Sequence, residues 1–461
     1  MPGYANWRTL YQQEYLQLKE EGYQVGDELY PQLKKNGNLF INSVNTQSMN
    51  NENNMTESDW EKAYHSLWKL REKGLRPDYP FVEPNGYDEI IEAAAEPPIL
   101  KQLDERRYAE KIKGAFYGRC AGVVLGKPLE MDVNRLEIKE FLESVDAYPL
   151  QDWVPAYSEK LDKRLREDCV ASTKGNVEYV QPDDDIHYTI LALLLVEKKG
   201  LDFSTYDVGV NIQDNIPYNW LWSTTKQAYY HMCNMVADRP FQEQVDEFTT
   251  KLNPMREGIN GTIRADIWGY ISPGDPRRAA KLAHQEASYN TCKNGLYGSM
   301  FTAACISSAL SMNPTIETIL QGGLSVIPKK SRLAKVVEEV SAWYAKEKEW
   351  IPVCDKIYEK YGHLPFAGGI NNLAFIILSL LHGQLDYTKT ITTAVMCGTD
   401  TDCTSGTAAS IVGAAIGYDK LDQKWIAPLN DRVKTVVADF GEGSISDIVK
   451  RIIAVRNKHN S

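Results

Sequence analysis

Hydrophobic residues recur every three to four positions through most of the chain, which is the spacing of residues on one face of an α-helix. From about Glu105 onward this spacing predicts helices over residues 111–125, 186–197, 277–288, 297–310, 333–350, 372–382 and 404–416. The alternating β-branched runs that are typical of strands are nearly absent. No fixed-period repeat points to a solenoid. The pattern therefore predicts an all-α protein.

The first hundred residues carry a helical pattern of their own. Apolar side chains at helical spacing over residues 7–18 predict a first helix that stops at Gly22. Ser58 and Glu61 have the spacing of a capping box, and they predict the start of a second helix that ends at Gly74.

The remainder of this region is less regular. A short helix is expected over residues 88–95, after a proline-rich passage. Residues 45–54 are polar and poor in apolar anchors, so we expect a mobile loop there. The chain is thus divided into an N-terminal helical extension, residues 1–104, and a second domain, residues 105–461.

Glycine occupies every fourth position of the helix expected over residues 111–125 and of its end. The stripe consists of Gly114, Gly118, Gly122 and Gly126. A face without side chains lets a neighbouring helix come close, whereas the lysines and arginine in the same stretch exclude a membrane-embedded dimer. Pro128 should stop this helix and project Glu130.

Three consecutive carboxylates, Asp183, Asp184 and Asp185, stand directly before the helix expected over residues 186–197. That helix is apolar on nearly every face, so it should be buried. Like charges in a low-dielectric site raise one another's pKa unless cations neutralise them. Taken alone, however, the triplet is also explained as an acidic N-cap that faces water.

A second acidic pair, Asp400 and Asp402, precedes the helix of small residues expected over 404–416. Carboxylates two positions apart in a loop can face one centre, as they do in oxygen-rich metal loops. Two acidic entrances to buried helices in one chain indicate shared cations. Because no cluster of histidine and cysteine accompanies them, we expect Mg²⁺ or Mn²⁺ and not Zn²⁺.

The composition of the chain excludes several classes of protein and of binding partner. The net charge of −11, from 51 basic and 62 acidic residues, disfavours binding to a nucleic-acid backbone. The apolar runs are too short to cross a bilayer, and the N-terminus has no signal-peptide pattern. Eight dispersed cysteines without a CxxC pair argue against structural zinc and against a disulfide scaffold. We expect a cytoplasmic protein with no nucleic-acid or membrane partner, and the oligomeric state stays open.

Together, the glycine-rich helix with its turn and the two acidic segments resemble the ADP-ribosylglycohydrolase family, which includes the dinitrogenase reductase-activating glycohydrolase. In that family a glycine-rich helix ends in a G-x-P-x-E-like turn, an acidic triplet opens a core helix, and a G-x-D-x-D-T loop lies near the C-terminus. One branch of the family is also similar at residues 264–275 (RADIWGYISPGD), 283–284 (AH), 294–298 (NGLYG) and 369–372 (GINN). The resemblance covers roughly residues 105–420 and implies a compact orthogonal bundle of many helices.

The resemblance implies roles for individual residues and a site for two Mg²⁺ or Mn²⁺ ions. The implied catalytic residues are Glu130, Asp184 and Asp185. The implied metal ligands are Asp183, Asp184, Asp185, Asp400, Asp402 and Cys403. Asp183 and Cys403 stand where the family usually has threonine, and Val123 stands where it often has aspartate.

A nucleotide pocket is expected further along the chain. Its predicted substrate contacts are His284, Asn294, Gly295, Tyr297 and Gly298. Packing explains the same residues, since a lone helical histidine is more often a core residue and the other four fit a turn followed by a helix start.

The resemblance implies hydrolysis of the ribosyl bond of an ADP-ribosyl group on a protein side chain, classically arginine, or of a related ADP-ribosyl conjugate. The metal ions would bind the ribose hydroxyls and a water, and cleavage at C1 would pass through an oxocarbenium-like state. Two alternatives stay open: a hydrolase of free small ribosides such as nucleosides, and a catalytically silent binding protein. The changes at Val123 and Cys403 keep the silent protein open as an alternative, whereas the five retained aspartates speak against it.

Overall fold

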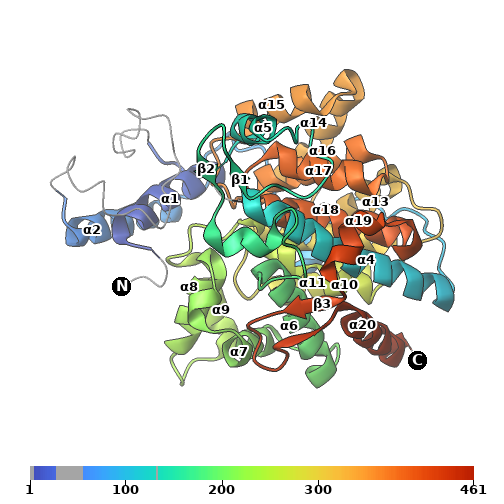
Figure 1. The fold of residues 1–461 in the computed structure, drawn as a ribbon. Coiled ribbons are helices and arrows are strands. Elements are labelled where there is room, and N and C mark those ends of the chain that lie inside the picture. The colour runs from blue at the N-terminus through green and yellow to red at the C-terminus, as the bar shows by residue number, and fades with distance from the viewer. Residues whose placement is uncertain (1–4, 27–54, 131–132, 461) are drawn as a thin grey trace.

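The computed structural model describes residues 5–26, 55–130 and 133–460 of the 461-residue chain. The loop expected over residues 45–54 lies outside them. Helices make up nearly all of the regular structure, so the all-α prediction is confirmed. Figure 1 shows most of the helices gathered in one body, with α1 and α2 at one side of it.

The body contains α4 to α20. Their bounds are α4 (Glu105–Gly126), α5 (Arg135–Ser144), α6 (Asp184–Lys199), α7 (Thr205–Asn215), α8 (Ser223–Cys233), α9 (Phe241–Thr250), α10 (Asp266–Tyr270), α11 (Pro276–Ala287), α12 (Lys293–Ala309), α13 (Ile316–Leu324), α14 (Arg332–Glu347), α15 (Trp350–Tyr361), α16 (Gly369–Gly383), α17 (Tyr387–Cys397), α18 (Thr401–Ile416), α19 (Gln423–Ile426) and α20 (Ile445–Asn460). Two short antiparallel hairpins complete it, β1 (Tyr157–Ser158) with β2 (Lys163–Arg164) and β3 (Arg432–Lys434) with β4 (Glu442–Ser444).

The N-terminal helices α1 (Trp7–Glu20) and α2 (Glu57–Trp68) pack around a small apolar cluster of their own. The capping box of α2 joins Thr56 and Asp59, because the Thr56 hydroxyl accepts from the Asp59 N–H at 3.3 Å and the Asp59 carboxylate accepts from the Thr56 N–H at 2.9 Å. The prediction that Ser58 and Glu61 form this box was wrong, because Thr56 and Asp59 have the same three-residue spacing and begin the helix earlier.

Two buried arginines of the body bind glutamates of the N-terminal region. Arg256 is completely buried and pairs with Glu14 at 2.9 Å and with Glu21 at 2.5 Å. Arg332 pairs with Glu83 at 2.8 Å. The short helix α3 (Tyr87–Ala93) completes the attachment, since its Ile90 belongs to the main hydrophobic core. The N-terminal region is therefore held to the body by buried charge as well as by apolar contact.

The helices α4 and α18 touch along the glycine stripe. A Cβ on Gly114 would lie 2.5 Å from the carbonyl carbon of Gly417, and one on Gly126 would lie 2.2 Å from the carbonyl oxygen of Thr401. Between these two ends, the Ser405 hydroxyl of α18 donates to the Gly122 carbonyl at 2.7 Å. The two backbones are thus in direct contact, which only glycine permits.

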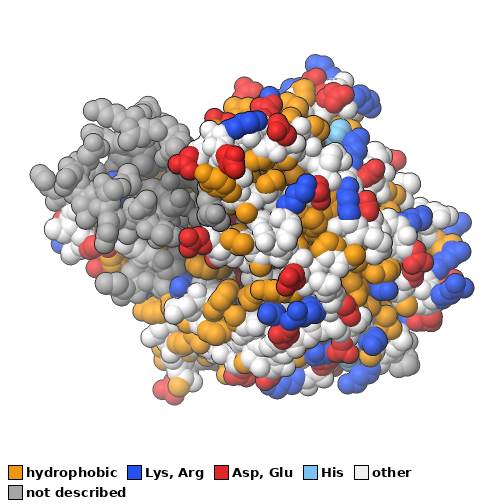
Figure 2. All heavy atoms as spheres, viewed as in Figure 1, with side chains coloured by type: hydrophobic (Ala, Val, Ile, Leu, Met, Phe, Trp, Pro, Cys, Tyr) orange, Lys and Arg blue, Asp and Glu red, His pale blue; other side chains and the backbone are white. Residues whose placement is uncertain are grey.

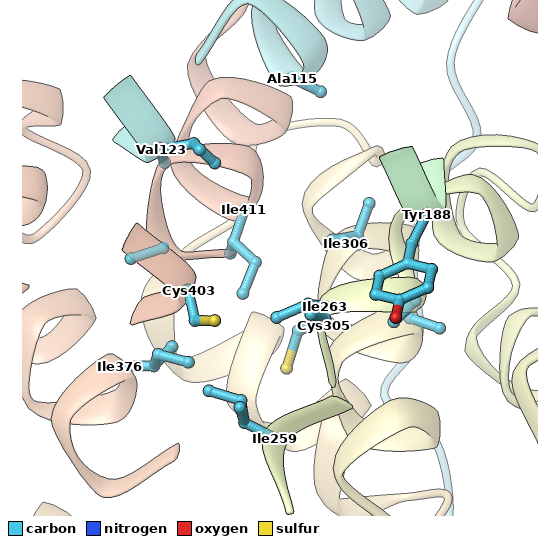
Figure 3. Packing of buried hydrophobic residues seen from close by; sticks show 14 of the residues in the cluster. Ala115, Val123, Tyr188, Ile259, Ile263, Cys305, Ile306, Ile376, Cys403 and Ile411 are labelled. Atoms are coloured by element: carbon cyan, nitrogen blue, oxygen red, sulfur yellow. The ribbon is translucent and has the colours of Figure 1, made fainter. Parts of the chain in front are cut away.

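The centre of the body consists of helices that are buried on nearly every side, among them α6, α12, α16 and α18. Figure 3 shows Val123 of α4, Ile411 of α18 and Ile306 of α12 directed into one common interior. The helices α6 and α18 therefore begin inside the protein, as the sequence predicted for the helices that follow the two acidic segments.

The differences from the predicted helices have local causes. The helix expected over residues 333–350 ends at Glu347, because Lys348 has a left-handed backbone with φ of 59°, and α15 begins at Trp350. The unpredicted α17 is rich in threonine, which has a low helix propensity, but its burial against α16 and α18 stabilises it.

None of the helices in the described ranges is both long and apolar enough to cross a bilayer. On the face drawn in Figure 2, acidic and basic side chains are intermixed. Apolar side chains gather at its lower left, where Figure 1 places α7, α8 and α9.

The contact between α4 and α18 gives a first prediction. Gly114→Ala should lower the free energy of unfolding by about 1–3 kcal/mol, because its Cβ has to push two backbones apart. Urea denaturation followed by circular dichroism measures this change. The control is Gly86→Ala, whose Cβ meets only the flexible Glu89 side chain and should cost less than about 1 kcal/mol. Equal stability of the two variants would contradict the prediction.

Candidate metal centre

The structure brings the two acidic segments and Glu130 together. Potential ligand atoms lie within 4.8 Å of one another in three groups, which share members. The groups are Asp183 with Asp184 and Asp185, Asp185 with Asp402 and Cys403, and Glu130 with Asp400 and Asp402. All of the residues predicted to be catalytic or to bind metal therefore meet at one place.

The loop before α18 is held in an unusual conformation by hydrogen bonds. Gly398 and Thr399 have φ of 87° and 67°, which turns the chain sharply after α17. The Thr399 N–H donates to the Val133 carbonyl and its hydroxyl donates to Asn372 Oδ1, both at 2.8 Å. This turn directs Asp400 and the start of α18 into the interior.

The end of α4 brings Glu130 to the same place. The α-helix ends at Gly126, and a 3-10 turn over Lys127–Leu129 replaces the abrupt stop expected at Pro128. The Thr401 hydroxyl donates to the Gly126 carbonyl at 2.8 Å, so this turn lies against the N-terminus of α18. Glu130 follows directly, with 22% of its side chain exposed. Glu130 and Asp184 are therefore the partly exposed members of the cluster, whereas the other four carboxylates are buried.

Three of the six carboxylates are paired with basic side chains. The ammonium of Lys127 contacts Asp183 Oδ2. The completely buried Arg119 contacts Asp185 at 3.1 Å and also Asp266 of α10 at 2.9 Å. Lys127 lowers the pKa of Asp183, although burial alone would raise it.

At the exposed side of the cluster, Arg166 donates to Glu130 Oε2 at 3.2 Å. The same guanidinium forms two hydrogen bonds with Asp168, at 3.1 and 2.7 Å. Burial and the charge of Asp402 nevertheless raise the pKa of Glu130 to about 8.

No basic side chain of the described residues forms an ion pair with Asp184, Asp400 or Asp402. Burial and the charge of Asp183 raise the pKa of Asp184 to about 7 and that of Asp402 to about 6. Burial and Asp402 raise the pKa of Asp400 well above its usual range. Oδ1 of Asp400 is buried and accepts no hydrogen bond. A buried carboxylate oxygen without a donor, among further uncompensated carboxylates, fits a divalent cation with oxygen ligands.

Cys403 is in the cluster, but its thiol acts as a donor. Its Sγ lies 3.1 Å from Asp185 Oδ2, and burial with the charge of Asp185 raises the pKa of the thiol well above its usual range. A neutral thiol is a poor ligand for Mg²⁺, which prefers oxygen. The arrangement therefore supports Cys403 as a partner of Asp185 more than as a metal ligand.

Comparison with known sequences decides the family. The sequence model of the ADP-ribosylglycohydrolase family matches residues 104–459. The chain belongs to the ADP-ribosylglycohydrolase family.

Among solved structures, one titled "ADP-ribosylglycohydrolase-related protein complex" is similar, with 11% identity and a TM-score of 0.42, over 76% of this chain and 99% of that one. No curated protein matches the sequence. The family membership supports a glycohydrolase that acts on ADP-ribosyl groups.

Val123 is one position where this family member departs from the family pattern. It is 1% exposed, and its side chain packs where Gly406 of α18 leaves room. Valine therefore serves the contact between α4 and α18 and adds no carboxylate to the site.

The residues predicted to contact substrate are engaged elsewhere. His284 Nε2 bonds to the Asn85 carbonyl at 2.8 Å, and the Tyr297 hydroxyl donates to the Pro84 carbonyl. Cβ atoms on Gly295 and Gly298 would lie 2.6 Å from the Arg256 carbonyl oxygen and 2.8 Å from the Thr262 hydroxyl.

Asn294, the fifth of these residues, also has its hydrogen bonds within the chain. Its side-chain nitrogen donates to Glu83 at 2.8 Å and to Glu257 at 3.0 Å, and its oxygen accepts from the Leu333 N–H at 3.0 Å. The segment thus binds residues 83–85 of the N-terminal region instead of lining the acidic cluster, and we do not include it in the proposed site.

Sequence reasoning missed the basic residues of the site. Lys127, Arg119 and Arg166 were not assigned a role, and neither was Asp266, which shares the Arg119 guanidinium. One signal was available for Arg119, because a charged residue in the middle of a helix whose glycine stripe predicts close packing must find an opposite charge if it is buried. The partners of these residues could not be identified, since they lie tens of residues away in the sequence.

The raised pKa values predict how stability depends on pH without metal. In EDTA the melting temperature should fall as the pH rises from about 5 to 8, because Asp402 and Asp184 have folded-state pKa values of about 6 and about 7, above the roughly 3.9 of an unfolded aspartate. The folded protein binds the extra protons, so their stabilising contribution is present at low pH and is lost through this window.

Asp402→Asn should flatten this fall, whereas Asp246→Asn, at an exposed position of α9, should not. Differential scanning fluorimetry in EDTA at four pH values measures the effect. A wild-type melting temperature that rises steadily from pH 5 to 8 would show that the carboxylates do not repel one another in the folded state.

Proposed function

We propose that this protein is a metal-dependent hydrolase that cleaves the bond between C1 of ribose and a protein side chain, of the arginine type, in ADP-ribosylated proteins. The observation that carries the proposal is the meeting of Glu130 with Asp184, Asp400 and Asp402 at two buried helix N-termini. Family membership supplies the class of bond, since the family model is that of an ADP-ribosylglycohydrolase.

The carboxylates without basic partners are the proposed ligands, and their oxygen chemistry suits Mg²⁺ or Mn²⁺. When bound, such an ion polarises the oxygen atoms that it contacts and helps to generate a water nucleophile. Asp185 and Asp183 support these ligands from the N-terminus of α6, where Arg119 and Lys127 fix their orientation.

Glu130 is the proposed catalytic acid and base. In hydrolysis, a water oxygen forms a bond to C1 while the bond from C1 to the leaving nitrogen breaks. The water loses a proton and the leaving group gains one. Glu130 lies toward solvent within reach of Asp400 and Asp402, and its pKa of about 8 suits a group that exchanges protons near neutral pH. Negative charge around C1 also stabilises the positive charge that develops in the transition state.

The decisive experiment is turnover of a panel, with and without Mg²⁺ or Mn²⁺. The panel consists of proteins ADP-ribosylated on arginine, proteins ADP-ribosylated on serine, and free nucleosides and ADP-ribose derivatives. Metal-dependent release of ADP-ribose from arginine supports the proposal. Activity on free ribosides alone supports the small-riboside alternative, and no turnover with intact metal binding supports the silent one.

The place of action is part of the same proposal. All eight cysteines are free thiols in the structure, and seven of them are buried. Thiols without disulfide partners suit a reducing compartment, so we propose that the protein acts in the cytoplasm.

Substitution of the ligands gives a further prediction. Asp184→Ala and Asp402→Ala should each lower turnover by at least about 10³-fold and should remove the rise in melting temperature on adding Mg²⁺ or Mn²⁺, because each loses a proposed ligand. Unchanged binding of divalent ions in both variants would contradict the assignment of these aspartates as metal ligands.

Substitution of Glu130 should have a different signature. Glu130→Gln keeps the shape of the side chain and should lower kcat by about 10²–10⁴-fold while the metal-dependent rise in melting temperature persists. A steady-state assay together with scanning fluorimetry separates the two effects. Wild-type kcat in this variant would exclude Glu130 as the proton-transfer group, and Asp246→Asn again provides the surface control.

A further inference from the structure

Lys127 lies inside the acidic cluster and not at its surface. Its ammonium contacts Asp183 Oδ2, with 11% of the lysine side chain and 1% of the aspartate side chain exposed. The other oxygen of Asp183 accepts from the Asp185 N–H at 3.0 Å. Both oxygens of Asp183 therefore have donors within the chain, so this carboxylate does not need a metal ion.

The surroundings of Lys127 keep it charged. An ammonium in contact with a carboxylate keeps its positive charge, and this one is covalently attached to the turn at the end of α4. A metal ion that bound the same carboxylates would lie close to the positive charge of Lys127 and would be repelled by it.

The hydrogen bonds of the site show which carboxylates are already occupied. Both oxygens of Asp183 have donors, and in Asp185 one oxygen bonds to Arg119 at 3.1 Å and the other to the Cys403 thiol at 3.1 Å. Asp184, Asp400 and Asp402 form no ion pair with a basic side chain of the described residues, so they remain as ligands for one divalent ion. A second divalent ion on the Asp183 side would have to displace the Lys127 ammonium or lie beside it, and like charges repel strongly where water is excluded.

We propose that Lys127 takes the place of a second metal ion, so that this protein holds one divalent ion, with ligands drawn from Asp184, Asp400 and Asp402. The inference rests on the proposed function in so far as it concerns the same site. It departs from the two ions that the family resemblance implies. In this arrangement the Asp183 side of the site is ordered by the protein itself, whatever the supply of metal.

Mn²⁺ binding tests the proposal without any assay of turnover. Full-length protein, stripped with EDTA, is titrated with MnCl₂ by isothermal titration calorimetry, and the saturated protein is examined by electron paramagnetic resonance. The expected result is one ion per chain with the hyperfine pattern of an isolated Mn²⁺. Two ions per chain with the spectrum of an exchange-coupled pair would overturn the proposal.

Variants of Lys127 test whether its charge is the cause. Lys127→Met removes the charge at similar length and should admit a second Mn²⁺, with a coupled spectrum. Lys127→Arg keeps the charge and should still hold one ion. Lys139→Met, at a partly exposed position of α5, is the matched control and should behave as wild type. A single ion in folded Lys127→Met, or two ions in Lys127→Arg, would overturn the proposal. If Lys127→Met does not fold, the ion counts of wild type and Lys127→Arg decide it.

The outcome is separable from that of the proposed function. One bound ion without turnover of any ribosyl substrate would remove the proposed function and leave the role of Lys127 standing. Two bound ions with metal-dependent turnover would do the reverse.

Discussion

The backbone contact between α4 and α18 is the constraint on which the site depends. Because glycine faces α18 at every fourth position of α4, the backbones of the two helices are in direct contact along this stripe. Their closeness fixes where α4 ends, and its final turn meets the N-terminus of α18 through the hydrogen bond from Thr401 to Gly126. Arg119, Lys127 and Glu130 are all carried on α4 and its terminal turns, so the packing of one helix pair places two cations and one carboxylate at the acidic cluster.

Electrostatics then explains the rest of the arrangement. The N-terminus of a buried helix stabilises only part of one negative charge, whereas six carboxylates gather here. On one side of the cluster, Lys127 pairs with Asp183 and Arg119 pairs with Asp185. The carboxylates at the start of α18, Asp400 and Asp402, have no basic partner among the described residues. The division between paired and unpaired carboxylates is what distinguishes a structural part of the cluster from a part that is suited to binding a ligand.

Local and periodic features of this protein could be predicted from its sequence. The buried helices α6 and α18, the acidic segments before them and the close approach at the glycine stripe all have signals within a few residues. Long-range pairing left no such signal. Nothing near Lys127 shows that its partner is Asp183, and nothing near Asn294 shows that Glu83 and Glu257 occupy its side chain. For the same reason the local motif at residues 294–298, which predicted a nucleotide pocket, did not reveal that Asn294 and Tyr297 bond to Glu83 and Pro84.

The arginine pairs between that region and the body have a consequence for what counts as one folding unit. The family match begins at residue 104, but the charges that satisfy Arg256 come from Glu14 and Glu21, and one of the partners of Arg332 is Glu83. A chain shortened to the matched residues would lose the carboxylates that pair with the buried Arg256 guanidinium and would expose the surface that the N-terminal region covers. The similarity to the family thus begins at residue 104, whereas cooperative unfolding should extend across this residue into the N-terminal region. The helices α1 and α2 therefore belong to the same thermodynamic unit as the body.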